Sequence, residues 1–213
     1  MPTLSQEDIC KFYKSIDADQ EEAKVSLILA STFGGCYSNL IHNHKNDDFD
    51  LTSINRDFAV KVTSVISKAS LDYIKYEDAL AQGKEADKKK GPTAVYDDDE
   101  SILGYLGEGR SFYCAKIQAA IRKKSSIAIR RIQKEPTFKR VELAIALPRC
   151  VLFDSIDSLM DLQSIMPALQ TPFSKIFLVT GTSPIAGTKL FVFDKNEGEK
   201  TPLRMLTIGT KGI

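Results

Sequence analysis

Apolar and polar residues alternate through the segment DFDLTSINRDFAVKVTSV, which spans residues 48–65. This alternation predicts an antiparallel hairpin of two strands, residues 48–54 and 57–65, joined by a tight turn at Asn55-Arg56. Side chains along a strand point to alternate faces, so the apolar residues of each strand are expected on one face. These residues are Phe49 and Leu51 on the first strand and Phe58, Val60 and Val62 on the second.

The polar face of this hairpin brings a carboxylate next to an ammonium group. A two-residue turn sets Asp50 opposite Lys61 and Thr52 opposite Ala59. In one interpretation the pair is a metal-dependent phosphodiesterase site, in which the aspartate holds Mg²⁺ and the lysine steadies the attacking water or the charge of the phosphorane. In the other it is a cross-strand ion pair on a solvated face, which contributes roughly a few tenths of a kcal/mol.

Helical spacing of apolar residues marks five other segments of the chain. We expect helices over about residues 5–15, 20–33, 67–88, 111–133 and 154–169. Gly34-Gly35 ends the second of these helices, and Ser125-Ser126 leaves the continuity of the fourth open. The region from about residue 83 to residue 100 is rich in Lys, Asp and Gly, and we expect it to be a mobile charged insertion.

Short apolar runs predict the remaining strands and with them the fold class. Val141–Leu147 (VELAIAL) is typical of a central strand, and we expect it in the same sheet as the hairpin. Other strands are expected at residues 36–42, 176–179 and 190–193, with an edge strand at 203–208. The prediction is a single α/β domain with a central mixed sheet flanked by helices and extra C-terminal strands.

Composition narrows the class of protein without naming a partner. The chain has 213 residues, 43% of them hydrophobic, and a formal net charge of +1, so a nucleic-acid signal must come from local clustering of charge. Four cysteines without a CxxC pair are typical of reduced thiols in the cytoplasm. We see no signal peptide and no apolar run near the ~20 residues of a membrane span, and therefore expect a cytoplasmic protein.

Positive charge is concentrated in the fourth predicted helix and just beyond it. The chain from Arg110 to Arg140 contains ten Lys or Arg residues and one acid, Glu135. At 100° per residue, four of these cations fall in one narrow sector beside an apolar stripe that Lys124 and Arg131 interrupt: Lys116, Lys123, Arg130 and Lys134. Such a face suits the phosphate backbone of nucleic acid. The alternative is a solvated helix that pairs with acidic loops.

His42 and His44 suggest a further kind of site. In an extended segment a His-x-His pair places both rings on one side, near Asp47 and Asp48, where zinc or another transition metal is conceivable. The alternative is a polar pair at the edge of a loop, since the chain has two histidines in all and no third ligand is fixed by spacing.

The predicted elements follow the order helix, three strands, helix and late central strand, with Asp50 on the second strand and Lys61 on the third. This arrangement resembles the PD-(D/E)XK or restriction-endonuclease-like nuclease superfamily. The resemblance implies a mixed sheet flanked by helices and Mg²⁺-dependent hydrolysis of DNA or RNA phosphodiesters. It also implies that Asp50 binds the metal and that Lys61 is the lysine of the E-x-K element. Glu21 or Glu22 stands for the acid of the family's first helix, and we take Glu22 as the third catalytic residue.

The chain departs from the family at the E-x-K glutamate, because Ala59 occupies that position. Asp57 on the same strand face is our candidate for the displaced metal ligand, with Asp72 and Glu77 as alternatives. Without such a ligand the protein is a nuclease-like protein that binds nucleic acid, or a protein partner, without cleaving. The sequence therefore leaves two functions open: a Mg²⁺-dependent nuclease and a non-catalytic binding protein.

Overall fold

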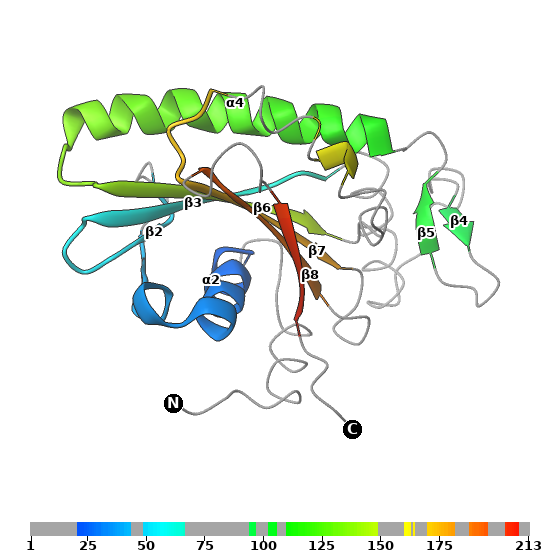
Figure 1. Cartoon of the computed structure of the whole chain (residues 1–213), viewed down its shortest axis with the longest axis horizontal. Coiled ribbons are helices and arrows are strands. Elements are labelled where there is room, and N and C mark those ends of the chain that lie inside the picture. Colours follow the sequence, from blue (N-terminus) through cyan, green and yellow to red (C-terminus); the bar gives the residue numbers. More distant parts are fainter. Residues whose placement is uncertain are drawn as a thin grey trace, which may run out of the picture.

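In the described part of the chain, a first helix precedes five strands and a second, long helix precedes the other four (Figure 1). The computed structural model describes residues 21–43, 49–66, 94–96, 102–105, 110–148, 160–162, 164, 170–181, 188–195 and 203–208. Its elements are α2 (Glu21–Phe33), the 3₁₀ helix η2 (Gly35–Tyr37), β1 (Ile41–His42), β2 (Leu51–Thr52), β3 (Phe58–Ser64), β4 (Ala94–Tyr96), β5 (Ile102–Tyr105), α4 (Arg110–Lys134), β6 (Arg140–Pro148), β7 (Lys175–Gly181), β8 (Thr188–Asp194) and β9 (Leu203–Ile208).

Seven of these strands form one mixed sheet in the order β1-β2-β3-β6-β7-β8-β9, and β4 pairs with β5 separately. The three central strands β3, β6 and β7 are parallel, whereas every other pair in the sheet is antiparallel. The predicted α/β class with a mixed sheet is confirmed. The hairpin and the predicted central strand do share this sheet, because β3 and β6 are direct neighbours.

Strand β6 lies at the centre because both of its faces are covered. Residues 141–147 are all buried, which explains why the run VELAIAL is nearly continuous rather than alternating. Its odd-numbered residues belong to one apolar cluster and Ala144 to another. The sheet therefore separates two cores.

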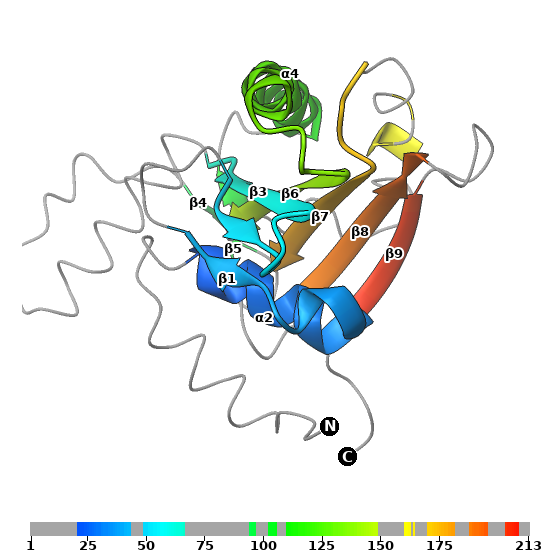
Figure 2. The same ribbon diagram turned by 90° about the vertical axis from the view of Figure 1, so that its left-hand side faces the viewer.

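Among the described elements, α4 covers one face of the sheet and α2 lies against the other, as Figures 1 and 2 show from two directions. The first core holds α4 on the face of Ala59, Leu143 and Ile145. Helix α4 contributes a buried stripe to this core: Tyr113, Ile117, Ile121 and Ala128. The second core holds α2, whose Val25, Ile28 and Leu29 pack with Phe58, Val60 and Val62 of β3.

Helix α4 is continuous through Ser125-Ser126. Ser125 is buried and donates a hydrogen bond to the Thr171 hydroxyl at 3.1 Å, so its polar group is satisfied inside the core. The helix is 25 residues long but carries eight Lys or Arg residues. Among the described helices, none is both long enough and apolar enough to cross a membrane.

The hairpin differs from its prediction in length and in one side chain. The first strand is only Leu51–Thr52, and a β-turn at residues 53–56, with the Arg56 N–H donating to the Ser53 carbonyl, makes the connection longer than two residues. Phe49 lies in the core of α4 rather than beside Leu51, because its ring packs edge-on against Phe138 at 5.0 Å.

The strand predicted at residues 36–42 is wrong over most of its length. Gly34 and Gly35 both have positive φ and turn the chain directly into η2. The N–H of Tyr37 then bonds the carbonyl of Gly34, which leaves only Ile41–His42 as a strand.

Several predictions fall mostly or wholly outside the described residues. They are the helices at 5–15 and 67–88, most of the helix at 154–169, and most of the insertion at 83–100. Within that insertion, Ala94–Tyr96 forms strand β4, which the sequence reading did not anticipate.

A matched pair of substitutions on α4 tests the assignment of its buried face. Ile117 is fully buried, whereas Ile129 on the same helix is 45% exposed. Ile117→Ala should lower the free energy of unfolding by about 3 kcal/mol because it leaves a cavity under the helix. Ile129→Ala makes the same change in helix propensity and should stay within about 0.5 kcal/mol of the parent. Urea denaturation measures both, and equal losses would contradict the assignment.

Candidate functional site

Asp50 and Lys61 meet on neighbouring strands as their register requires. Leu51 pairs with Val60 and Thr52 with Ala59, which confirms the predicted register although the turn is longer. The Lys61 Nζ atom lies 2.8 Å from Asp50 Oδ1, and both side chains are nearly buried, at 12% and 13% exposure. The backbone N–H of Val62 donates to the other oxygen, Oδ2. Both carboxylate oxygens of Asp50 are therefore already engaged.

A second lysine joins this pair from the helix above. Lys124 of α4 is half-buried, and its pKa is lowered by burial and by the positive charge of Lys61, while Asp50 raises it. The cluster contains one carboxylate and two ammonium groups. Its net charge is positive when both lysines are protonated, so it suits an anion better than a cation.

Ala59 occupies a place where a carboxylate is hard to accommodate. It is fully buried in the same apolar cluster as Phe49 and Phe138. It also lies on the α4 face, as Lys61 does, so the expected strand face of the E-x-K position is present. A glutamate there would have to bury its charge in an apolar core, which is costly.

The structure does not bring Asp57 to Asp50. Asp57 directly precedes β3 and is four residues from Lys61. Four residues of extended strand span about 13 Å. Its Oδ1 accepts a hydrogen bond of 2.6 Å from the Ser53 hydroxyl, and this bond is the main reason its pKa is lowered. Asp57 therefore organises the hairpin connection.

Glu22 lies on the other side of the sheet from the Asp50–Lys61 pair. It is on α2, and α2 packs against the face of β3 that carries Val60, whereas Lys61 points to the α4 face. The alternatives Asp72 and Glu77, together with His44, lie outside the described residues, and His42 is exposed on β1. Among the residues that are described, no group of three or more His, Cys, Asp or Glu side chains is arranged to hold a metal ion.

At the Asp50–Lys61 pair the described residues supply one carboxylate as a possible ligand for Mg²⁺. Both oxygens of this carboxylate already accept hydrogen bonds from the protein. Mg²⁺ prefers an octahedral shell of oxygen ligands, usually with one or two carboxylates. These residues alone do not form such a shell.

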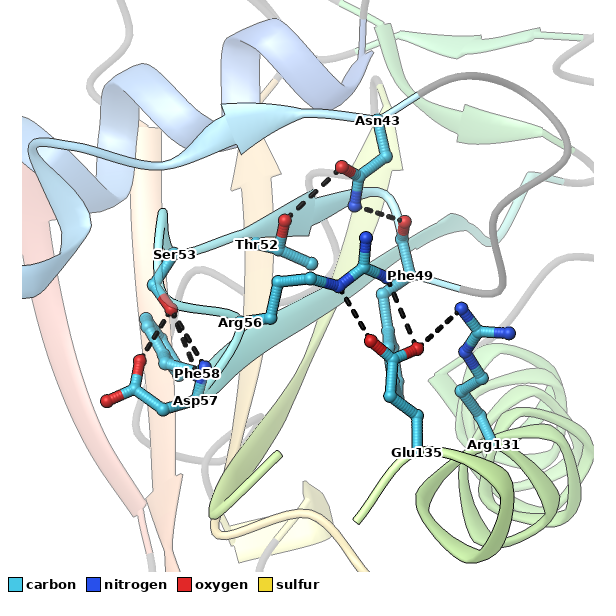
Figure 3. A network of polar contacts seen from close by, with 9 residues as sticks. All are labelled: Asn43, Phe49, Thr52, Ser53, Arg56, Asp57, Phe58, Arg131 and Glu135. Atoms are coloured by element: carbon cyan, nitrogen blue, oxygen red, sulfur yellow. Dashed lines mark hydrogen bonds and ion pairs between the residues drawn. The ribbon is translucent and has the colours of Figure 1, made fainter. Parts of the chain in front are cut away.

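A polar network fastens the hairpin to the end of α4 (Figure 3). Glu135 forms ion pairs with Arg56 and Arg131, each at 2.7 Å, and it also accepts a hydrogen bond of 3.3 Å from Arg56 Nη2. The Arg56 guanidinium lies 5.6 Å from the centre of the Phe138 ring. At the other side of the hairpin, Asn43 donates to the carbonyl of Phe49 at 2.9 Å. The sequence reading singled out Glu135 as the lone acid of a basic segment but did not assign it this role.

The four cations predicted for nucleic-acid contact are all exposed on α4: Lys116, Lys123, Arg130 and Lys134. The two basic residues that interrupt the apolar stripe show which way this sector faces. Lys124 approaches Lys61, and Arg131 reaches Glu135 and hence Arg56. Both lie on the edge of the buried stripe that is nearer to the basic sector, which places the basic sector on the hairpin side of α4. We call these four residues the basic side of α4.

A second polar cluster, which the sequence reading missed, lies on the α2 face. Glu142 is fully buried opposite Val60 in the β3–β6 ladder. The Tyr37 hydroxyl donates to both of its oxygens at 3.0 and 3.1 Å, and Arg140 Nε lies 3.1 Å from Oε1. Burial raises the pKa of Glu142 from 4.5 to about 7, although Arg140 and Tyr37 lower it. Burial, followed by the charge of Glu142, also raises the pKa of Tyr37. The signal available in the sequence was one acid inside the apolar run VELAIAL.

The raised pKa of Glu142 predicts a characteristic dependence of stability on pH. A buried carboxyl that binds its proton more tightly when folded stabilises the protein below pH 4.5, and this contribution is lost as pH rises through 7. The loss amounts to roughly 3 kcal/mol in the free energy of unfolding. Compared with the parent, Glu142→Gln should therefore remove a downward slope between about pH 5 and 8 in chemical denaturation.

Tyr37→Phe provides the directional check of the same assignment. It removes a hydrogen bond that lowers the pKa of Glu142 and keeps the buried ring. The decline in stability should then extend to higher pH. Parent and Glu142→Gln profiles of identical slope would contradict the account.

Comparison with known proteins finds no relative of this chain. No protein-family model, no curated protein and no solved structure matches the chain.

Proposed function

We propose that this chain is a cytoplasmic protein of restriction-endonuclease-like fold that binds nucleic acid through the phosphate backbone along the basic side of α4. The observation that carries the proposal is the row of four exposed cations bordering the Asp50–Lys61–Lys124 cluster. Eight Lys or Arg residues and no acid lie within α4 itself. The charge is thus local, as it must be in a chain with a net charge of only +1.

The length and shape of the row support a linear polyanion as its partner. Lys116 and Lys134 are 18 residues apart, which is about 27 Å along a helix. A duplex of about eight base pairs has this length, at 3.4 Å per base pair. Cations that lie in one row along a single helix match the linear array of phosphates on a duplex better than they match the irregular charges of an acidic protein surface.

The Asp50 cluster supports binding more than hydrolysis. Its carboxylate is committed to Lys61 and Val62, and its overall charge favours a phosphate group rather than a cation. Lys61 and Lys124 would then extend the basic side of α4 inward. Glu135 and Arg56 keep the hairpin fixed beside the helix, so this surface is preformed.

The proposal predicts how binding responds to salt. Each phosphate neutralised by a lysine or arginine contributes about −0.9 to the slope of log affinity against log salt for duplex DNA. Lys123→Gln combined with Arg130→Gln should reduce the magnitude of this slope by about two. Fluorescence anisotropy of a labelled duplex at several salt concentrations provides the measurement.

Arg122→Gln is the matched control for that variant. Arg122 is exposed but lies 100° around the helix from Lys123, on the side of Gln118 and Ala115. Those two residues line a separate cavity with Asp161. The control removes one charge and should leave the slope nearly unchanged. A decrease of about 0.9, half of that expected for the double variant, would contradict a defined nucleic-acid face.

Metal-dependent hydrolysis is the second candidate function, and it rests on the placement of an acid and a lysine, Asp50 and Lys61, on neighbouring strands, as in the nuclease superfamily that the sequence resembles. Any further metal ligand would come from residues beyond those described. If the chain cleaves DNA or RNA with Mg²⁺ or Mn²⁺, Asp50→Ala and Lys61→Ala should each lower the rate by several orders of magnitude. Asp57→Ala is the matched control and should retain activity, because Asp57 bonds Ser53 away from the pair. Gel assays of cleavage decide, and absence of metal-dependent cleavage by the parent protein would reject this candidate.

A further inference from the structure

A cavity of about 310 Å³ opens beside the hairpin, on the face of the sheet opposite α4. Arg140 and Lys139 line it together with Phe58, Asn39 and Cys36, and the hairpin connection closes one side. Arg140 shares a face with Phe58 because the two residues are partners in the β3–β6 ladder. The cavity is therefore distinct from the basic side of α4.

Arg140 is held in place from three directions. Its guanidinium stacks 4.1 Å from the centre of the Phe58 ring, its Nε atom lies 3.1 Å from the buried Glu142, and its Nη2 donates to Cys36 Sγ at 3.1 Å. The side chain nevertheless remains 39% exposed. A cation fixed in this way loses little conformational entropy when it binds a ligand.

The guanidinium keeps most of its hydrogen-bonding capacity. Arginine has five N–H donors. Within the described residues the bond to Cys36 is its one hydrogen bond, and the Nε–H, although close to Glu142, is not aligned to make another. A planar fork with open donors matches two oxygens of a phosphate group.

We propose that this cavity binds an oxyanion, in the first place a phosphate group, with Arg140 as its anchor. Lys139 adds a second positive charge at the rim, and its backbone is fixed by a hydrogen bond of 2.8 Å from its N–H to the Asp57 carbonyl. Asp57 also lines the cavity; its carboxylate accepts a hydrogen bond from Ser53, and its charge offsets part of the positive charge of Lys139 and Arg140. The volume admits a phosphate together with a small organic substituent.

Glu142 couples this binding to pH. It faces Tyr37 from η2 and Arg140 on its own strand, and it senses Lys175 from β7 and Asp194 from β8. Lys175 and Asp194 pair with each other at 2.9 Å, so their charges largely offset at Glu142. The ionised Glu142 neutralises Arg140, whereas the protonated Glu142 leaves the guanidinium charge to the ligand. With a pKa of about 7, the protonated fraction falls roughly tenfold between pH 6 and pH 8.

Sulfate is the probe for the test, because its charge does not change between pH 6 and pH 8. Titration of the full chain at constant ionic strength, followed by NMR, should show saturable binding that is up to about tenfold tighter at pH 6 than at pH 8. Arg140→Gln should abolish it, and Lys116→Gln on α4 should not affect it. Glu142→Gln should bind with little dependence on pH. Should Glu142→Gln fail to fold, the profile of the parent and the Arg140→Gln variant still decide.

Sulfate binding that Arg140→Gln leaves unchanged, or the absence of saturable binding at pH 6, would overturn the proposal. Two further arms identify the source of the phosphate. A nucleoside monophosphate that binds in competition with sulfate indicates a small-molecule ligand. The second arm compares an oligonucleotide that bears a 5′-phosphate with the same oligonucleotide without it. If Arg140→Gln weakens binding of the phosphorylated oligonucleotide alone, the ligand is a nucleic-acid end.

Discussion

The parallel pairing of β3 with β6, between two helical layers, is the constraint from which both candidate sites follow. Each strand is covered on both faces, so consecutive residues belong alternately to the α4 side and to the α2 side. This alternation sends Lys61 toward α4 and its neighbours Val60 and Val62 toward α2. The same alternation on β6 sends Glu142 toward α2, into an otherwise apolar layer. A shift of one residue in either strand would exchange the two sites and bury the wrong side chains.

Charged residues on such strands are costly, and the fold compensates each of them differently. Lys61 is neutralised by Asp50 across the hairpin, and Glu142 is bonded by Tyr37 and approached by Arg140. Buried ion pairs of this kind seldom add net stability relative to well-packed apolar residues. Stability alone therefore does not explain their presence in the two central layers, and we propose that they serve anion binding. The positive cluster near Lys124 and the held guanidinium of Arg140 are both suited to anions.

The periodicity of apolar residues was sufficient to predict much of the fold. Alternation and an expected two-residue turn predicted the contact of Asp50 with Lys61. The observed connection is longer, but it keeps Thr52 opposite Ala59 and therefore the same register. The helical stripe beginning at Tyr113 predicted the buried face of α4. Which helix covers which face of the sheet is a property of the whole topology, so spacing did not reveal that Glu22 lies across the sheet from Asp50. Phe49 left its predicted face because a ring contact distant in sequence, with Phe138, governs its position.

The missed cluster has a similar physical origin. The run VELAIAL was read for its apolar character, and the partner that makes Glu142 tolerable lies 105 residues earlier in the chain. Tyr37 reaches it because two glycines with positive φ turn the chain into η2, where sequence had predicted a strand. A single charge inside a central strand is thus a useful signal of a long-range polar contact, even when its partner is hidden.

The central claim is that nucleic acid lies along α4 beside the hairpin and is held by charge. NMR titration of ¹⁵N-labelled protein with a short duplex, first in EDTA and then with excess Mg²⁺, measures this directly. The account predicts amide shifts concentrated from Lys116 to Lys134 and around Lys61, present in EDTA and similar after Mg²⁺ is added. Shifts confined to α2 and the Arg140 cavity, or no binding under either condition, would contradict it.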